Sequence, residues 1–176
     1  MKKVLLFVLS FVILGSSCVY AGTDEHPAPY VGTAEFERLK GLNGIWKGTS
    51  QMEGKEEEAI VEYDVTSNGS TVVEKLFPGT PHEMVTVYYD RKGKLSMTHY
   101  CGLGNQPQMN LVSSNENEMK FNFSKTSDID PAKEAHMHSL ILTFDGNNRL
   151  NHAWQYYQNG AEAGITNITL TRTSPN

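Results

Sequence analysis

The chain has 176 residues, with 15 Lys and Arg against 20 Asp and Glu, a formal net charge of −5 and 39% hydrophobic residues. This length suits a single domain with a substantial core. The acidic balance disfavours nucleic acid and anionic lipid as partners, because both require a basic surface.

The N-terminus predicts an export signal at residues 1–21. Lys2 and Lys3 precede an apolar stretch from Val4 to Leu14, and Ala21 is suited to cleavage before Gly22. Removal of residues 1–21 leaves 155 residues with 13 basic and 20 acidic side chains, a formal charge of −7. We expect a periplasmic or secreted protein that does not associate with a membrane after cleavage. A lipid anchor at Cys18, in a sequence loosely similar to a lipobox, is the alternative.

The rest of the chain predicts a flexible lead-in and one all-β domain. Residues 22–33 form the lead-in, and the domain spans residues 34–176. Thr33 is suited to cap a short helix from Ala34 to Lys40 that ends at Gly41. About ten strands follow, separated by Gly and Asn turns, at 43–51, 57–66, 70–77, 82–90, 94–102, 107–113, 117–126, 135–145, 149–158 and 162–173. We expect an antiparallel up-and-down β-barrel, because closure removes the edges of the sheet.

The turn at Arg91-Lys92-Gly93 predicts which side chains face the interior. A three-residue loop with Gly93 in the left-handed region would pair Val85 with His99 and Val87 with Met97. These residues and Cys101 would then share the inner face. A slip of one residue would reverse the assignment.

The stretch Gly44-Ile45-Trp46-Lys47-Gly48 resembles the Gly-x-Trp element that opens the first strand of lipocalin and wider calycin barrels. The resemblance implies that a basic residue in the last strand covers the tryptophan, and Arg172 occupies that position. Gly44, Trp46 and Arg172 are therefore expected to have structural roles.

Two further resemblances concern function. The stretch from Pro78 to Tyr89, followed by Thr98 to Pro107, is similar to a family of small, uncharacterised exported bacterial proteins with lipocalin-like barrels, which implies no established activity. A weaker similarity, in the Gly-x-Trp-x-Gly opening, links the chain to nitrobindin-like haem barrels. The last strand contains no histidine to match their haem ligand.

These features predict a binding protein for a small apolar or amphipathic molecule. The candidate ligand-binding residues are His99, Cys101, Asn105, Gln106, Val85, Met97, His138 and Trp154. We predict no cofactor, no metal site and no catalytic residue, and the assignment as an enzyme stays open.

Two alternatives use other chemistry. Interior histidines (His136, His138 and His152) would bind haem or a metal ion. Cys101, which is the only cysteine after the signal, would serve a thiol-dependent enzyme with His99 as its base. Residues two apart on a strand lie about 7 Å from each other, which weakens a direct Cys-His pair.

Overall fold

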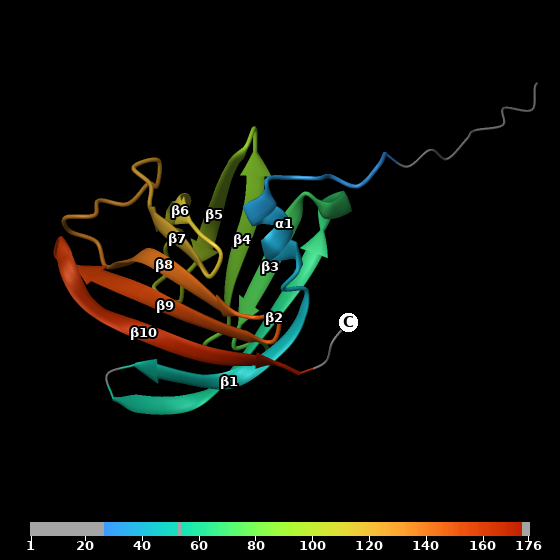
Figure 1. The fold of residues 1–176 in the computed structure, drawn as a ribbon. Helices are drawn as coiled ribbons and strands as arrows, with labels where there is room; N and C mark the ends of the chain where they lie inside the picture. The colour runs from blue at the N-terminus through green and yellow to red at the C-terminus, as the bar shows by residue number, and fades with distance from the viewer. Residues whose placement is uncertain (1–26, 53, 174–176) are drawn as a thin grey trace, which may run out of the picture.

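A computed structural model describes residues 27–52 and 54–173, and it confirms the all-β fold class. Ten antiparallel strands form a closed barrel in the order β1-β10-β9-β8-β7-β6-β5-β4-β3-β2 (Figure 1). Their bounds are β1 Gly44–Met52, β2 Lys55–Thr66, β3 Thr71–Leu76, β4 Met84–Arg91, β5 Lys94–Tyr100, β6 Gln108–Ser114, β7 Glu118–Phe123, β8 His136–Asp145, β9 Arg149–Gln158 and β10 Ala161–Arg172. A 3-10 turn, η1 Ser67–Gly69, joins β2 to β3.

The short helix α1 spans Ala34–Lys40, as the sequence predicted, and lies against one end of the barrel. The Thr33 hydroxyl accepts a hydrogen bond from the Phe36 N–H at 3.4 Å, which caps the helix. Phe36 and Leu39 are fully buried in the core at this end of the barrel. The helix is therefore held chiefly by its apolar face.

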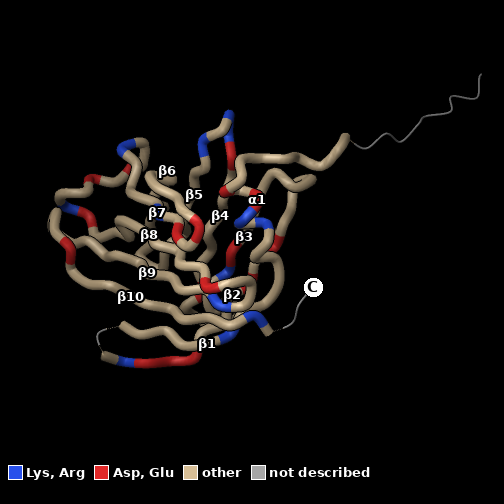
Figure 2. The backbone as a smooth tube through the Cα atoms, viewed as in Figure 1, with Lys and Arg blue, Asp and Glu red and all other residues tan. Residues whose placement is uncertain are grey.

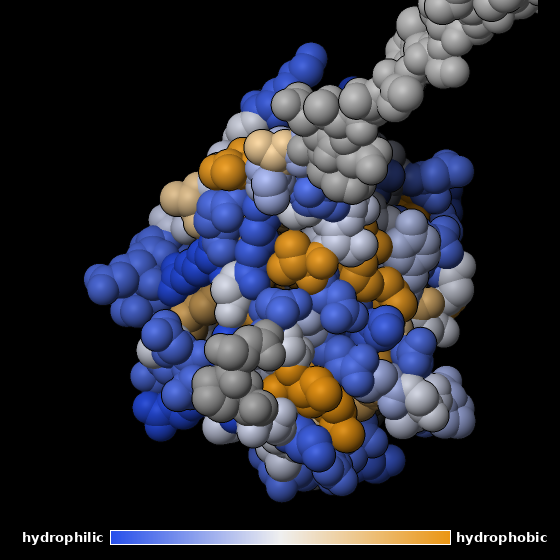
Figure 3. Space-filling view, turned by 90° about the vertical axis from the view of Figure 1, so that its right-hand side faces the viewer, coloured by the Kyte–Doolittle hydropathy of each residue, from blue (hydrophilic) through white to orange (hydrophobic). Residues whose placement is uncertain are grey.

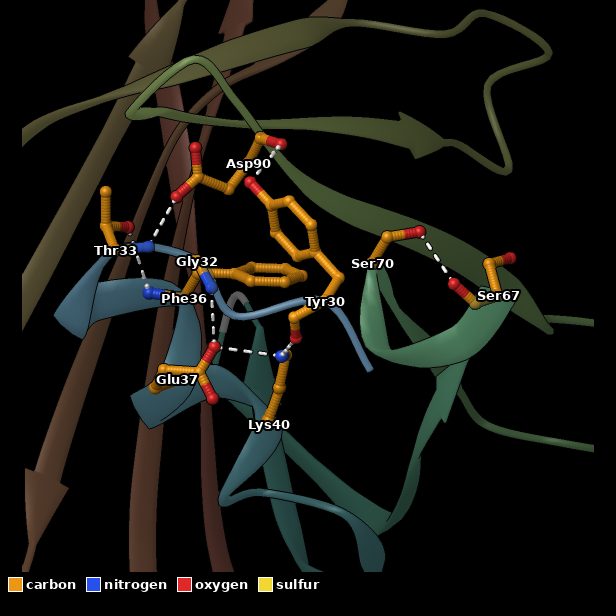
Figure 4. A network of polar contacts seen from close by, with 9 residues as sticks. All are labelled: Tyr30, Gly32, Thr33, Phe36, Glu37, Lys40, Ser67, Ser70 and Asp90. Carbon is orange, nitrogen blue, oxygen red and sulfur yellow. Dashed lines mark hydrogen bonds and ion pairs between the residues drawn. The ribbon is translucent and has the colours of Figure 1, made fainter. Parts of the chain in front are cut away.

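Polar contacts tie the segment before α1 to the barrel (Figure 4). The Thr33 N–H donates to the Asp90 carboxylate at 2.6 Å. Lys40 Nζ lies 2.8 Å from Glu37 Oε1 and donates to the Tyr30 carbonyl at 2.6 Å. The predicted lead-in is thus bonded to β4 and α1 where it is described, from residue 27 onward. The export signal and Cys18 lie outside the described residues.

Trp46 and Arg172 close the helix end of the barrel. The Arg172 guanidinium lies 4.3 Å from the centroid of the Trp46 ring, which is the contact expected from the sequence. Arg172 also donates to the carbonyls of Asn43 and Gly41 at 2.8 and 2.7 Å. The Trp46 indole N–H donates to the Leu42 carbonyl at 2.8 Å. One charged side chain therefore joins the last strand to the turn that begins the first.

The turn between β4 and β5 differs from the prediction. Arg91 pairs with Lys94, so the loop contains only Lys92 and Gly93, and both have positive φ. Such a two-residue turn matches the twist of the strands, and it requires Lys92 as well as Gly93 to be left-handed. Consequently Thr86, not Val85, pairs with His99, and the predicted facing of β4 is wrong. Val85 lies on the outer face of the barrel, whereas Thr86 and Tyr88 are buried inside it.

The surface carries dispersed charge. Figure 2 shows one concentrated acidic stretch at the start of β2, formed by Glu56, Glu57 and Glu58. On the face seen in Figure 3, apolar residues form separate patches between hydrophilic ones. Within the described part of the chain, no helix is long and apolar enough to span a membrane.

Gly48 marks a close approach between β1 and β10. A Cβ atom at Gly48 would lie 1.8 Å from the Thr169 carbonyl oxygen, which belongs to the backbone and has little room to move. A Cβ atom at Gly164 on β10 would have no such neighbour within 4 Å.

We predict that Gly48→Ala lowers the free energy of unfolding by about 2 kcal/mol, because β1 and β10 must separate to accept the methyl group. Urea denaturation measures the change, with Gly164→Ala as the matched control that changes it by less than about 0.5 kcal/mol. Equal stability of the two variants would contradict the close approach.

Candidate functional site

A cavity of ≈290 Å³ opens at the end of the barrel opposite α1. Exposed Met52, Glu57 and His82 lie at its mouth, and buried His99 and Trp154 lie deeper. The remaining lining residues are Ser50, Leu76, Phe77, Met84, Met137, Thr166 and Ile168. The walls are mainly apolar, and three of the lining side chains are flexible methionines that can adapt to an occupant.

Two residues that line the cavity each hold a buried polar atom with no hydrogen-bond partner among the described residues. The two atoms are His99 Nε2 and Trp154 Nε1. The two rings lie against each other, with centroids 4.5 Å apart. A buried polar group without a partner costs about 1–3 kcal/mol, so each atom favours an incoming polar group.

A row of polar side chains runs from His99 across four neighbouring strands. Tyr63 on β2 pairs with Glu74 on β3, Glu74 pairs with Thr86 on β4, and Thr86 pairs with His99 on β5. All four side chains are buried. Since cross-strand partners point to the same face, the row forms one continuous band inside the barrel.

Glu74 is the centre of this row. The hydroxyls of Tyr63 and Tyr88 donate to its two carboxylate oxygens at 3.0 and 2.8 Å. Burial raises the pKa of Glu74 to about 7, and hydrogen bonds from Tyr88, Tyr63 and Thr86 oppose part of that rise. Burial, reinforced by the nearby Glu74 charge, raises the pKa values of Tyr63 and Tyr88 well above their usual value. The tyrosines therefore stay protonated as donors.

The two histidines of this region are neutral. Burial lowers the pKa of His99 to about 4 and that of His152 to about 3. His152 Nδ1 lies 3.4 Å from Glu74 Oε1, and its Nε2 lies 2.9 Å from the Tyr63 hydroxyl. Because His152 is neutral, its approach to Glu74 is a polar contact rather than an ion pair.

The structure brings together only part of the predicted site. His99 and Trp154 line the cavity, whereas Met97 is fully buried outside its lining and Val85 faces outward. Asn105 donates to the Ala135 carbonyl at 2.8 Å, and Gln106 donates to the Gly104 carbonyl at 3.4 Å. These two amides therefore hold loops in place and do not line the cavity.

Cys101 begins the loop after β5 and is a free, half-buried thiol. Burial raises the pKa of Cys101, and backbone hydrogen bonds from Leu103 and Gly102 offset part of that effect. His99 Nδ1 lies 3.0 Å from the Thr86 hydroxyl, so its described hydrogen bond is to Thr86 rather than to the thiol. A raised thiol pKa is the opposite of what a thiolate nucleophile requires.

The two histidines of β8 lie together, with His136 Nε2 3.0 Å from His138 Nδ1, but His152 of β9 does not join them as the interior metal site would require. A β-bulge lies between Met137 and Ser139, so the expected alternation from His138 to Leu140 is interrupted and Met137 lines the cavity. His138 stacks on Tyr157 at 3.9 Å, whereas His152 pairs with Leu142 farther along β8. Within residues 27–52 and 54–173, no group of three or more His, Cys, Asp or Glu side chains is arranged to hold a metal ion.

Sequence reasoning missed the members of the polar row other than His99. Glu74 alternates with Val72 and Leu76 on β3, which are both apolar and buried. A charged residue on the apolar face of a strand is a signal of a buried functional or structural carboxyl. The predicted register placed Val85 and Val87 inside, which leaves the alternate residues Thr86 and Tyr88 outside, and the two-residue β4–β5 turn reverses that arrangement.

Comparison with known proteins supports the fold alone. No family model matches the chain, and no curated protein matches it. Among solved structures, the chain is similar to a crystal structure from Nostoc punctiforme PCC 73102, described as a protein of unknown function from the DUF3598 family. The TM-score is 0.53 at 11% identity, and the match covers 85% of this chain and 53% of that one. The chain thus spans about half the length of this structural neighbour.

The raised pKa of Glu74 predicts that the contribution of this one group to stability falls with increasing pH. Between about pH 4.5 and pH 7 the folded protein keeps a proton on Glu74 that the unfolded chain has lost, so each rise in pH favours unfolding. From pH 5 to pH 8 this contribution amounts to about 2 kcal/mol. Glu74→Gln removes it, and urea denaturation of both proteins at the two pH values measures the difference. An unchanged pH dependence in the variant would contradict the buried, ionisable carboxyl.

The lowered pKa values of His99 and His152 act in the opposite direction. Below about pH 6.5 the unfolded chain binds protons that the folded histidines do not accept until about pH 4 and 3, so stability falls as the pH falls. At pH 5 each histidine costs about 2 kcal/mol relative to pH 7.5. His152→Gln is expected to remove about half of this acid destabilisation, whereas the control Asn151→Gln on the same strand, which removes no titrating group, leaves it unchanged. Equal acid sensitivity of the two variants would show that His152 is not held neutral.

Proposed function

We propose that the protein binds one small, largely apolar molecule in the cavity at the open end of the barrel. The observation that carries the proposal is an apolar cavity of ≈290 Å³ lined by two residues that each hold a buried, partnerless polar atom, His99 Nε2 and Trp154 Nε1. Apolar walls with a few convergent polar groups are typical of ligand sites. The apolar part of the ligand would contact Leu76, Ile168 and the methionines, and its polar end would reach His99 and Trp154.

The charges around the cavity favour a neutral ligand. None of the described lining residues is Lys or Arg, and Glu57 lies at the mouth beside Glu56 and Glu58. A carboxylate ligand would enter past this acidic stretch and would find no cation to compensate its desolvation.

The expected export signal adds a location to the proposal. A periplasmic or secreted protein with this site would act as a carrier or scavenger of a sparingly soluble molecule. In this reading the barrel is a lipocalin-like or calycin-type binding protein, and the Trp46–Arg172 contact is the feature that supports the resemblance.

A cavity-filling variant tests the proposal. Thr166 lies on β10 in the cavity wall, and the next residue, Asn167, is exposed on the opposite face of the same strand. We expect wild-type protein to bind the neutral fluorescent probe N-phenyl-1-naphthylamine saturably at one site. Thr166→Phe should weaken that binding at least about tenfold because the new ring occupies the cavity, and Asn167→Phe should bind as the wild type does.

Fluorescence titration of the three proteins, each checked for folding by circular dichroism, measures the effect. Absence of saturable probe binding to the wild type, or equal binding to both variants, would overturn the assignment of the cavity as the ligand site.

A further inference from the structure

The hydrogen-bond row that ends at His99 determines which polar group the cavity accepts. The row contains Glu74, Thr86 and His99 in direct cross-strand register. A carboxylate can only accept hydrogen bonds, and a threonine hydroxyl has a single proton to donate. Glu74, at the end of the row away from the cavity, therefore sets which group donates and which accepts in each hydrogen bond along the row.

The direction runs from His99 toward Glu74. Above its pKa of about 7 Glu74 is a carboxylate, and Thr86, its cross-strand partner on β4, donates to it, so the Thr86 oxygen accepts from the other neighbour. That neighbour is His99 Nδ1, at 3.0 Å. A neutral imidazole carries one N–H, so a proton on Nδ1 leaves Nε2 with a free lone pair. Burial keeps the ring neutral by lowering the pKa of His99 to about 4.

The deep end of the cavity is thus lined by two residues that each hold one buried, unpartnered polar atom. His99 Nε2 is the acceptor, and the indole N–H of Trp154 is the donor. Their rings are in contact, with centroids 4.5 Å apart. A hydroxyl group satisfies both, because its proton can go to Nε2 while its oxygen accepts from Nε1–H. A ketone or ether supplies only the acceptor, and His99 Nε2 would remain unpaired.

We propose that the cavity selects small apolar alcohols, whose hydroxyl group donates to His99 Nε2 and accepts from the Trp154 indole N–H. This inference rests on the proposed function and adds the chemical class of the ligand. The cavity of ≈290 Å³ corresponds to about ten aliphatic or water-sized groups at about 30 Å³ each, and the flat, fused rings of the aromatic probe place more atoms in the same volume. An eight-carbon alcohol has this size.

The isosteric pair 2-octanol and 2-octanone tests the inference. Both are neutral and share one carbon skeleton, so they differ in the donor that the alcohol alone possesses. We expect 2-octanol to displace N-phenyl-1-naphthylamine from the wild-type protein at pH 8 at least about tenfold more strongly than 2-octanone does. Equal or stronger displacement by the ketone, or displacement by neither compound, would overturn the inference while probe binding itself leaves the proposed function intact. Failure of the probe to bind would instead refute the proposed function.

Substitutions in the row should change the preference for the alcohol over the ketone, which a purely structural role of these residues would leave unchanged. In Glu74→Gln the new amide N–H can donate to Thr86, whose proton then turns to His99 Nδ1 and places the ring proton on Nε2. The alcohol preference should then fall to near parity or invert toward the ketone. Thr86→Val, which removes the connecting hydroxyl with little change of shape, should also reduce the preference. Retention of the full tenfold preference in both variants would exclude control by this row.

The tautomer of His99 can be measured without ligand or substitution. Long-range ¹H–¹⁵N correlation spectra of the wild-type protein at pH 8 should show His99 protonated at Nδ1 and unprotonated at Nε2. Protonation at Nε2 would overturn the inference whether or not the variants fold.

Discussion

The buried carboxyl of Glu74 is the constraint on which the interior of this barrel depends. Glu74 is fully buried, and no Lys or Arg is among the groups described as bonding to it. Its charge is compensated by hydroxyl donors from Tyr63, Tyr88 and Thr86. These donors must all point at one carboxyl, so their orientations are fixed, and Thr86 passes that constraint on to His99. A buried polar network of this kind specifies one arrangement of the strands that surround it.

The two ends of the barrel interior differ, because one is packed with side chains and the other encloses the cavity. At the helix end, the space is filled by Phe36, Leu39 and Trp46. There Arg172 of the last strand bonds to the segment just before the first strand. At the opposite end the walls enclose a cavity that side chains do not fill. The Glu74 row lies between these regions and reaches the cavity at His99. Packing thus holds the polar row in a fixed position, whereas the flexible methionines allow the rest of the cavity to adapt its shape to a ligand.

The strands could be predicted from the sequence because their signals are local. Alternating apolar residues and Gly or Asn turns determined each strand to within a few residues, and the cap at Thr33 located α1. The Trp46–Arg172 contact could also be predicted, because the Gly-x-Trp resemblance links a residue of the first strand to one of the last. These features depend on periodicity and turn chemistry, which a single sequence carries.

Most of the site could not be predicted in this way because it depends on register between strands. A left-handed conformation at Lys92 shortened one turn by a residue and reversed the facing of Val85 and Thr86. The bulge after Met137 had a similar effect on His138. Glu74, Thr86 and His99 become neighbours only after β3, β4 and β5 have paired, so no local pattern contains them.

A crystal structure of the protein with 2-octanol, grown at pH 8, tests the role of His99 and Trp154 in ligand binding. We expect the hydroxyl oxygen within about 3.2 Å of both His99 Nε2 and Trp154 Nε1, with the alkyl chain directed toward Met52 at the mouth. A ligand with its hydroxyl at the mouth and its chain against His99, or a ligand bound elsewhere on the protein, would contradict that role.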